Sequence, residues 1–142
     1  MKKIYSVLFI LSCLLINFNA QAEDCSAGID LVCKAFNDGA RKMKNSKTFE
    51  QFNQIDFDSL IDEDELNKLP ESAAFCPFSP ADRSKLKTSI DGFINAMGDA
   101  MYQISGGALS QQDINSQLSP MRDMFHNAID QSNNLVQLFQ MF

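Results

Sequence analysis

Apolar residues recur at every third or fourth position in three long stretches of the chain, which is the spacing of one face of an α-helix. The stretches predict helices over residues 26–44, over 80–104 and from 120 to the C-terminus. Their apolar faces carry Ile29, Val32, Cys33, Phe36, Ala40 and Met43 in the first, Leu86, Ile90, Phe93, Ile94, Met97, Met101 and Ile104 in the second, and Met121, Met124, Phe125, Ala128, Ile129, Leu135, Val136, Phe139 and Phe142 in the third.

Local start and stop signals support this division. Ser79 can cap a helix that begins with Pro80, and Gly106-Gly107 predicts the end of that helix. The pair Ser119-Pro120 predicts a second start of the same kind, for the last helix. Two shorter helices are predicted, one after Thr48 with Phe49 and Phe52, and one after Ser110 with Ile114 and Leu118.

Residues 55–79 form an irregular connection in which acidic residues and prolines are frequent. One short helix is predicted near residues 62–68, and the apolar tail Phe75-Cys76-Pro77-Phe78 is expected to pack onto the helices. The fold class is therefore all-α, a small bundle of three main amphipathic helices with one to three short helices. We predict a core of Phe36, Leu86, Ile90, Phe93, Met97, Met101, Phe125, Leu135 and Phe139.

The first 22 residues have the pattern of a secretory signal peptide, which leaves residues 23–142 as a single helical domain. Lys2 and Lys3 precede the apolar run 4–16, and Ala20-Gln21-Ala22 offers small residues at a cleavage site. The run is too short for an ordinary membrane span, and a lipoprotein signal at Cys13 is the weaker alternative. The pattern predicts export to a bacterial periplasm or the exterior, with no stable membrane insertion after cleavage.

Three cysteines remain in residues 23–142, and an oxidising compartment favours a disulfide. Cys25 and Cys33 would lie about 12 Å apart along a helix, too far for a bond. Cys76 is therefore a partner of one of them. We predict Cys33–Cys76, because Cys33 lies on the apolar face, with Cys25 either free, available for a dimer, or the alternative partner of Cys76.

Charge narrows the classes of function. The chain has 12 basic and 18 acidic residues, and residues 23–142 carry a net charge of about −8 because both leader lysines are lost. This sign argues against nucleic acid as a partner. No catalytic sequence motif is present, so an enzyme is not predicted. The only histidine, His126, is expected on the polar face of the last helix.

Two residue groups could hold a cofactor or a metal, although no cofactor is predicted. Met97, Met101, Met121 and Met124 could bind copper or haem, but all lie on apolar faces where methionine fills a core. Carboxylates at Asp56, Asp58, Asp62 and Asp64 could bind calcium weakly, although the spacing does not match an EF-hand.

The sequence thus predicts a small exported helical protein that binds a macromolecular partner, with an unknown protein as that partner, and does no catalysis. A carrier that holds an apolar ligand, haem or a metal in the bundle is the first alternative. It predicts a cavity among Phe93, Met97, Met101, Phe125 and Phe139. A weak calcium-dependent module is the second alternative.

Overall fold

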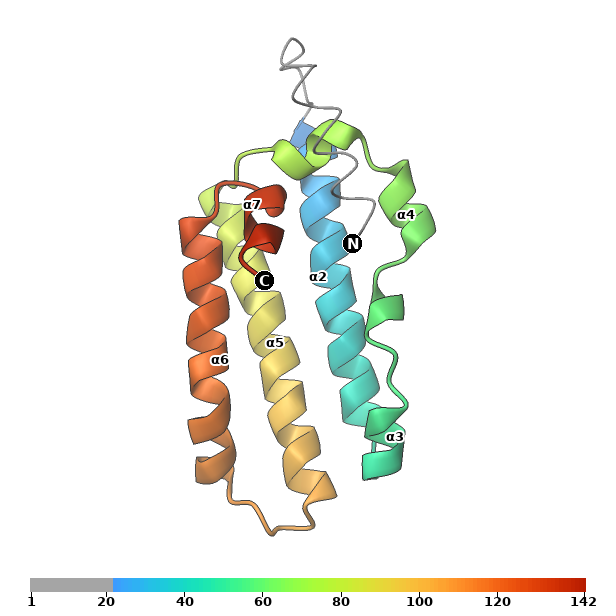
Figure 1. Cartoon of the computed structure of the whole chain (residues 1–142), viewed down its shortest axis with the longest axis vertical. Helices are drawn as coiled ribbons and strands as arrows, with labels where there is room; N and C mark the ends of the chain where they lie inside the picture. The colour runs from blue at the N-terminus through green and yellow to red at the C-terminus, as the bar shows by residue number, and fades with distance from the viewer. Residues whose placement is uncertain (1–21) are drawn as a thin grey trace.

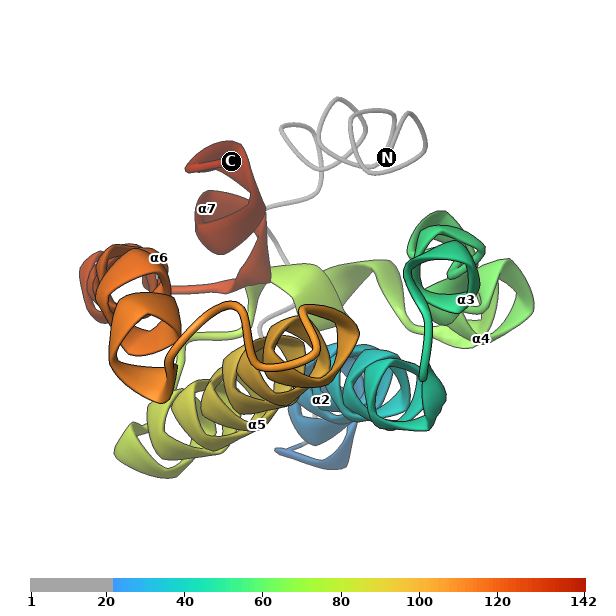
Figure 2. The ribbon, with the colours of Figure 1, turned by 90° about the horizontal axis from the view of Figure 1, so that it is seen from below.

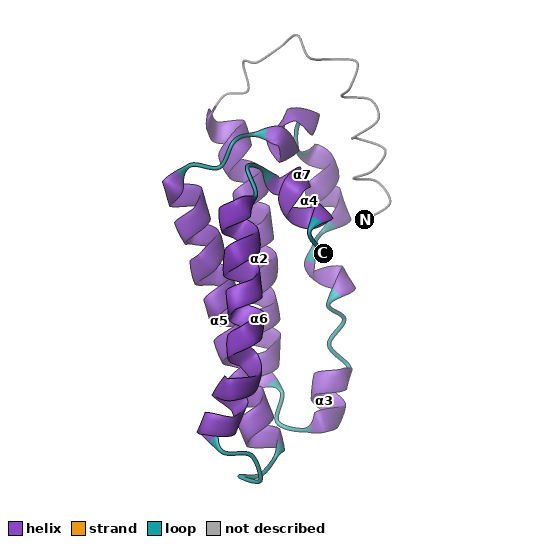
Figure 3. Ribbon diagram, turned by 60° about the vertical axis from the view of Figure 1, so that its left-hand side comes forward, coloured by secondary structure: helices purple, strands orange, loops and turns teal. Residues whose placement is uncertain are grey.

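The computed structural model describes residues 22–142, which form an all-helical bundle (Figure 1). Its long helices are α2 (Ala22–Asn45), α5 (Pro80–Ile104) and α6 (Gln111–Gln131). Its short helices are α3 (Phe49–Asn53), α4 (Glu63–Lys68) and α7 (Leu135–Gln140), with 3-10 turns η1 (Asp58–Leu60) and η2 (Glu71–Phe75). No strand occurs among the described residues (Figure 3). The predicted fold class, with three main helices, is confirmed.

The predicted signal peptide lies outside the described residues, except for Ala22 at the start of α2. α2 therefore begins earlier than the predicted residue 26 and continues to Asn45. None of the helices within residues 22–142 combines the length and the apolar character that a membrane crossing requires.

The three long helices form one layer with α5 in its middle, packed against both α2 and α6 (Figures 1 and 2). The connection from α3 to η2 runs back along α2, from its C-terminal end to its N-terminal end (Figure 1). α7 and η2 lie on one side of the layer and contact each other (Figure 2). α7 and η2 therefore cover the layer near the start of α2.

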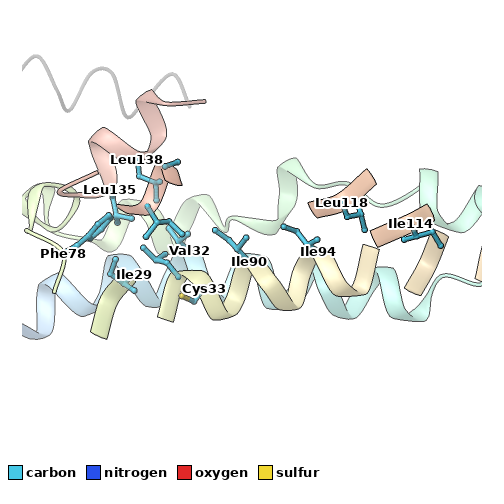
Figure 4. Close-up of a cluster of buried hydrophobic side chains, with 13 residues drawn as sticks. Ile29, Val32, Cys33, Phe78, Ile90, Ile94, Ile114, Leu118, Leu135 and Leu138 are labelled. Atoms are coloured by element: carbon cyan, nitrogen blue, oxygen red, sulfur yellow. The ribbon is translucent and has the colours of Figure 1, made fainter. Parts of the chain in front are cut away.

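Buried aliphatic side chains hold the layer together. Leu86 and Ile94 are fully buried on α5, and Ile129 is fully buried on α6 (Figure 4 shows Ile94 in the cluster). Burial of each such side chain contributes about 1.5–3 kcal/mol. Of the predicted core, Leu86, Ile90 and Leu135 are buried, and the remaining residues are partly buried and pack against the cluster: Phe36, Phe93, Met97, Met101, Phe125 and Phe139.

α5 begins and ends where the sequence predicts. The Ser79 hydroxyl accepts a hydrogen bond from the Asp82 backbone N–H, and the Asp82 carboxylate accepts one from the Ser79 N–H. This capping box satisfies two backbone donors at the start of the helix. After Ile104 the chain turns at Gly106 and Gly107, whose φ angles of 61° and 87° favour glycine.

The prediction of two helices on either side of Ser119-Pro120 is wrong, because α6 runs through both residues. A proline inside a helix removes one hydrogen bond and costs about 3 kcal/mol. Packing offsets this cost, because Ile114 and Leu118 on the first half of α6 are buried against α5. Gly98 of α5 permits the contact: a Cβ there would lie only 3.2 Å from Leu118 Cδ1.

The last predicted helix is wrong at its other end as well, since α6 stops at Gln131 and α7 is a separate helix. Asn134 caps α7 with its side chain, which accepts a hydrogen bond from the Gln137 N–H. Arg83 of α5 stabilises the end of α6, because its Nη1 donates to the backbone oxygen of Ser132 at 2.6 Å. The chain therefore turns after α6, and α7 lies beside η2.

Candidate functional site

An apolar cavity of about 230 Å³ lies among α2, the α4–η2 segment and α7. We call it the α7 cavity. Figure 4 shows two of its residues, Val32 of α2 and Leu135 of α7, on neighbouring elements. The lining is mostly aliphatic and consists of Gly28, Leu31, Val32, Ile61, Leu66, Asn67, Leu69, Pro70, Glu71, Ala73, Ala74, Leu135, Val136 and Phe139.

Each wall of the cavity follows from a local pattern in the sequence. Leu31 and Val32 are buried on α2, and Leu135 and Val136 are buried on α7. Gly28 lets these two helices approach closely, because a Cβ at this position would lie 2.9 Å from Leu135 Cδ1. The third wall comes from the connection, where Ile61, Leu66 and Leu69 lie within an acidic segment and line the cavity.

A disulfide fixes the third wall to α2, and it joins Cys25 to Cys76 with their Cα atoms 5.5 Å apart. The predicted Cys33–Cys76 bond is wrong, and the alternative partner is the correct one. The reason lies in the path of the connection, which reaches the N-terminal end of α2 before α5 begins (Figure 1). Cys33 lies two turns further along α2 and is a free, buried thiol. With Cys25 bonded inside the chain, the predicted dimer through Cys25 is not available to the oxidised protein.

Polar contacts hold the same wall at two further points. The Lys34 ammonium on α2 lies 3.0 Å from both carboxylate oxygens of Glu65 on α4. This ion pair raises the pKa of Lys34 above its ordinary value. Beyond the disulfide, the Phe78 N–H donates to the Asn133 backbone oxygen at 2.7 Å and so links the end of the connection to the start of α7. The cavity walls are thus tied to one another.

The carrier prediction named five residues around a cavity in the bundle, and the structure packs all of them against the buried core: Phe93, Met97, Met101, Phe125 and Phe139. The Phe36 ring lies between two of these rings, 5.5 Å from Phe93 and 6.4 Å from Phe125, centroid to centroid. Of the five residues, Phe139 alone lines the α7 cavity. The α7 cavity therefore lies at the edge of the buried core, where Val32 and Leu135 belong to both.

The methionines named as cofactor candidates do not form one site. Met97 and Met101 pack against the buried core from α5, and Met121 does so from α6. Met124 is 52% exposed, so its predicted place in the core is wrong. Packing accounts for the first three thioethers, and Met124 lies at the surface.

Two of the four acidic residues named as calcium candidates, Asp56 and Asp62, use their carboxylates to bind nearby backbone N–H groups. The Asp56 carboxylate accepts hydrogen bonds from the N–H groups of Asp58 and Ser59 at the start of η1. The Asp62 carboxylate accepts from the N–H groups of Asp64 and Glu65 and caps α4. In residues 25–142, no three metal-binding side chains of His, Cys, Asp or Glu gather at one point.

His126 has a partner that the sequence did not reveal. Its Nε2 lies 2.8 Å from Oδ1 of Asp91 on α5, and the same oxygen lies 3.3 Å from Arg122 Nε. Arg122 also donates to the Asn95 side-chain oxygen. A His–Asp pair can orient an imidazole for catalysis, but such a site also needs a nucleophile within hydrogen-bond reach of the other ring nitrogen. The partners of His126 within the described chain link α5 to α6.

The free thiol of Cys33 is also placed for packing. Burial raises the pKa of Cys33 above its ordinary value of 9.0, and a hydrogen bond with Ser89 partly offsets this effect. A reactive cysteine instead needs a lowered pKa and access to solvent. Cys33 therefore behaves as a small apolar residue between α2 and α5.

Comparison of the chain with protein-family models, with curated proteins and with solved structures found no match. The α7 cavity and the surface around it are thus the grounds on which a function can be argued.

Proposed function

We propose that the protein acts by non-catalytic binding, and that its ligand is an apolar group held in the α7 cavity. The observation that carries this proposal is a cavity of about 230 Å³ whose lining is apolar except for Asn67 and Glu71. An engineered apolar cavity of about 150 Å³ is enough to bind benzene. The α7 cavity has room for a larger ligand than that, such as a short alkyl chain.

The attachment of the walls supports a binding role. The disulfide and the Lys34–Glu65 ion pair join the connection to α2, and the Phe78–Asn133 hydrogen bond joins it to the start of α7. A site that is formed before the ligand arrives loses less affinity to ordering of the protein. The position of the cavity at the edge of the buried core also lets a ligand enter without separation of the three long helices.

We propose further that the protein works outside the cytoplasm, in a bacterial periplasm or the exterior. The signal-peptide pattern in residues 1–22 supports this location. The Cys25–Cys76 disulfide supports it independently, because such bonds persist mainly in oxidising compartments.

Titration of the oxidised protein with 1-octanol tests the proposal. Each buried CH₂ contributes about 0.8 kcal/mol, so an octyl chain contributes about 6 kcal/mol before the cost of association. That cost weakens binding, so a dissociation constant of roughly 0.1 mM to a few millimolar is expected. Isothermal titration calorimetry gives the affinity, and NMR shifts of the Leu135 and Val136 methyl groups locate the ligand. Absence of binding up to the solubility of octanol would refute the proposal.

A cavity-filling variant sharpens the experiment. Ala74 lines the cavity and is only half-buried, so Ala74→Phe is expected to occupy the space and weaken octanol binding at least tenfold. Ala108→Phe is the matched control, because Ala108 is exposed in the turn between α5 and α6. Should Ala74→Phe fail to fold, Leu69→Phe adds bulk to the same wall and replaces it.

A protein partner remains the second candidate, because the C-terminus presents an apolar patch. We define the C-terminal patch as Met124, Met141 and Phe142, which are 52%, 47% and 60% exposed. They line a shallow hollow with Pro120 and Ala128. Exposed apolar groups that gather in this way are typical of protein contacts.

Site-specific photo-crosslinking in the native cells tests this second candidate. A photoreactive residue in place of Phe142 is expected to form one abundant adduct with a defined protein, identified by mass spectrometry. The same residue in place of Phe49, which is 64% exposed on α3, is the control. Equal adducts from both positions, or none from position 142, would rule out a partner at the C-terminal patch.

A further inference from the structure

The polar residues that line the α7 cavity are few, and one of them is charged. Asn67 and Glu71 are the polar members of an otherwise apolar lining. Glu71 is exposed, so this residue lies where the cavity meets solvent. Its carboxylate makes no hydrogen bond or ion pair with any residue in the described part of the chain.

The charges near the mouth have one predominant sign. The wall from residue 62 to 71 contains five acidic residues and a single lysine, Lys68. On the facing helix α2, Lys34 lies opposite this wall and is already paired with Glu65. The α7 wall adds no charged side chain, because residues 131–142 contain no ionisable one. A ligand head group at this mouth therefore meets a negative surface on which the Glu71 carboxylate is unpaired.

We infer that the ligand of the α7 cavity is an amphipathic molecule with a single apolar tail and a cationic head group. This inference rests on the proposed function and names the class of ligand. The tail occupies the aliphatic cavity, and the head group lies in solvent beside Glu71. A head group that stays hydrated avoids the large cost of burying a charge. An anionic head group, as in a fatty acid, would instead lie beside carboxylates of its own sign.

The expected selectivity follows from the exposure of Glu71. An exposed pair of opposite charges stabilises a complex only modestly, and a like-charged pair destabilises it by a similar amount. A cationic ligand is therefore expected to bind about two- to fivefold more tightly than a neutral one with the same tail. It is expected to bind on the order of tenfold more tightly than an anionic one. Added salt should reduce both ratios, because these charges are open to screening.

Three probes with the same eight-carbon tail test the inference on the oxidised protein: octyltrimethylammonium, 1-octanol and nonanoate. Calorimetry at low ionic strength is expected to rank them in that order of affinity. Glu71→Gln should bring the cation close to octanol while leaving octanol unchanged. Glu50→Gln is the matched control, because Glu50 is an exposed carboxylate on α3 that does not line the cavity.

The outcomes separate this inference from the proposed function. Equal affinity for all three probes, or a preference for nonanoate, would overturn the cationic head group and leave the cavity as an apolar site. A preference for the cation that survives Glu71→Gln would overturn the role of Glu71. Failure of all three probes to bind would overturn the proposed function, and the inference with it.

Discussion

Removal of the Cys25–Cys76 disulfide tests how the connection between α2 and α5 is held. The double substitution Cys25→Ala with Cys76→Ala removes the bond and leaves no new free thiol beside Cys33. The bond closes a loop with a sequence separation of 51 residues, which contains α3, α4 and both 3-10 turns. Most residues of the connection are exposed or half-buried, and the disulfide fastens its end covalently to α2.

The length of the loop sets the size of the effect. In the chain-entropy treatment, a closed loop of this length lowers the entropy of the unfolded state by an amount that corresponds to about 4 kcal/mol at 25 °C. The free energy of unfolding is expected to fall by about that much. For a domain of this size, the midpoint of thermal unfolding should then fall by on the order of 15 °C.

Urea unfolding followed by far-UV circular dichroism measures the change, because the slope and midpoint together give the free energy of unfolding. Cys33→Ala is the control. It removes a buried sulfur without removing a cross-link, so it should cost only about 1 kcal/mol. Peptide mapping of the non-reduced protein is expected to recover Cys25 joined to Cys76, with Cys33 as a thiol.

Two results would refute this account of the connection. If the double-alanine variant unfolded at the urea concentration of the unsubstituted protein, the disulfide would not restrain the unfolded chain as argued. If mapping recovered Cys33 joined to Cys76, the path of the connection along α2 would be wrong. Octanol binding by the double variant is measured at temperatures where this variant stays folded. A loss of binding there would show that the disulfide also maintains the shape of the α7 cavity.

Three further predictions concern single residues. Pro120→Ala restores a backbone N–H donor at an exposed position inside α6. Urea titrations should show a free energy of unfolding about 1–3 kcal/mol higher than that of the unsubstituted protein. A loss of stability would show that Pro120 has a structural role. Gly92→Ala should stabilise α5 by about 0.5–1 kcal/mol, because a Cβ there meets no atom within 4 Å. Gly39→Ala should instead destabilise the fold, because its Cβ would lie 2.8 Å from the Phe93 ring. The same urea titrations compare the two variants. Cys33 has a raised pKa, so the unfolded thiol ionises first as the pH rises above about 9. The stability that Cys33 contributes is therefore present below that pH and is lost as the pH rises through the pKa of the native thiol. Iodoacetamide should label Cys33 far more slowly in the folded protein than in urea. Equal labelling rates would show that the thiol is accessible in the folded protein.

Much of the fold could be predicted because the strongest signals are local. Ser79, Pro80 and Asp82 satisfy the first backbone donors of α5 with atoms close by in the sequence, so their effect does not depend on the rest of the fold. The apolar stripes of α2 and α5 are also local signals. The period of a helix is fixed, so residues at this spacing lie on one face, and an apolar face is expected to be buried. The short helix at α4 was predicted from equally local features, near residues 62–68.

The errors occurred where distant contacts decide the outcome. Ser119-Pro120 has the composition of a helix start, but Ile114 and Leu118 pack against α5 and keep the chain helical through the proline. Helical geometry excluded a Cys25–Cys33 bond correctly. It could not choose between the two remaining bonds, because the choice depends on which end of α2 the connection crosses.

The α7 cavity was not predictable for a related reason, although the sequence contains a trace of it. Ile61, Leu66 and Leu69 lie within an acidic segment that has no helical stripe of its own. Aliphatic residues in such a segment must either face solvent or cover an apolar surface elsewhere in the fold. Three of them within nine residues favour contact with an apolar surface. That surface is the side of α2 that α5 leaves uncovered, together with α7. Short helices joined by turns cannot interdigitate with it as closely as a long helix would, so a space remains between them. An apolar cavity is therefore the expected result when a connection rich in acidic residues, and tied down by one disulfide, takes the place of a fourth long helix.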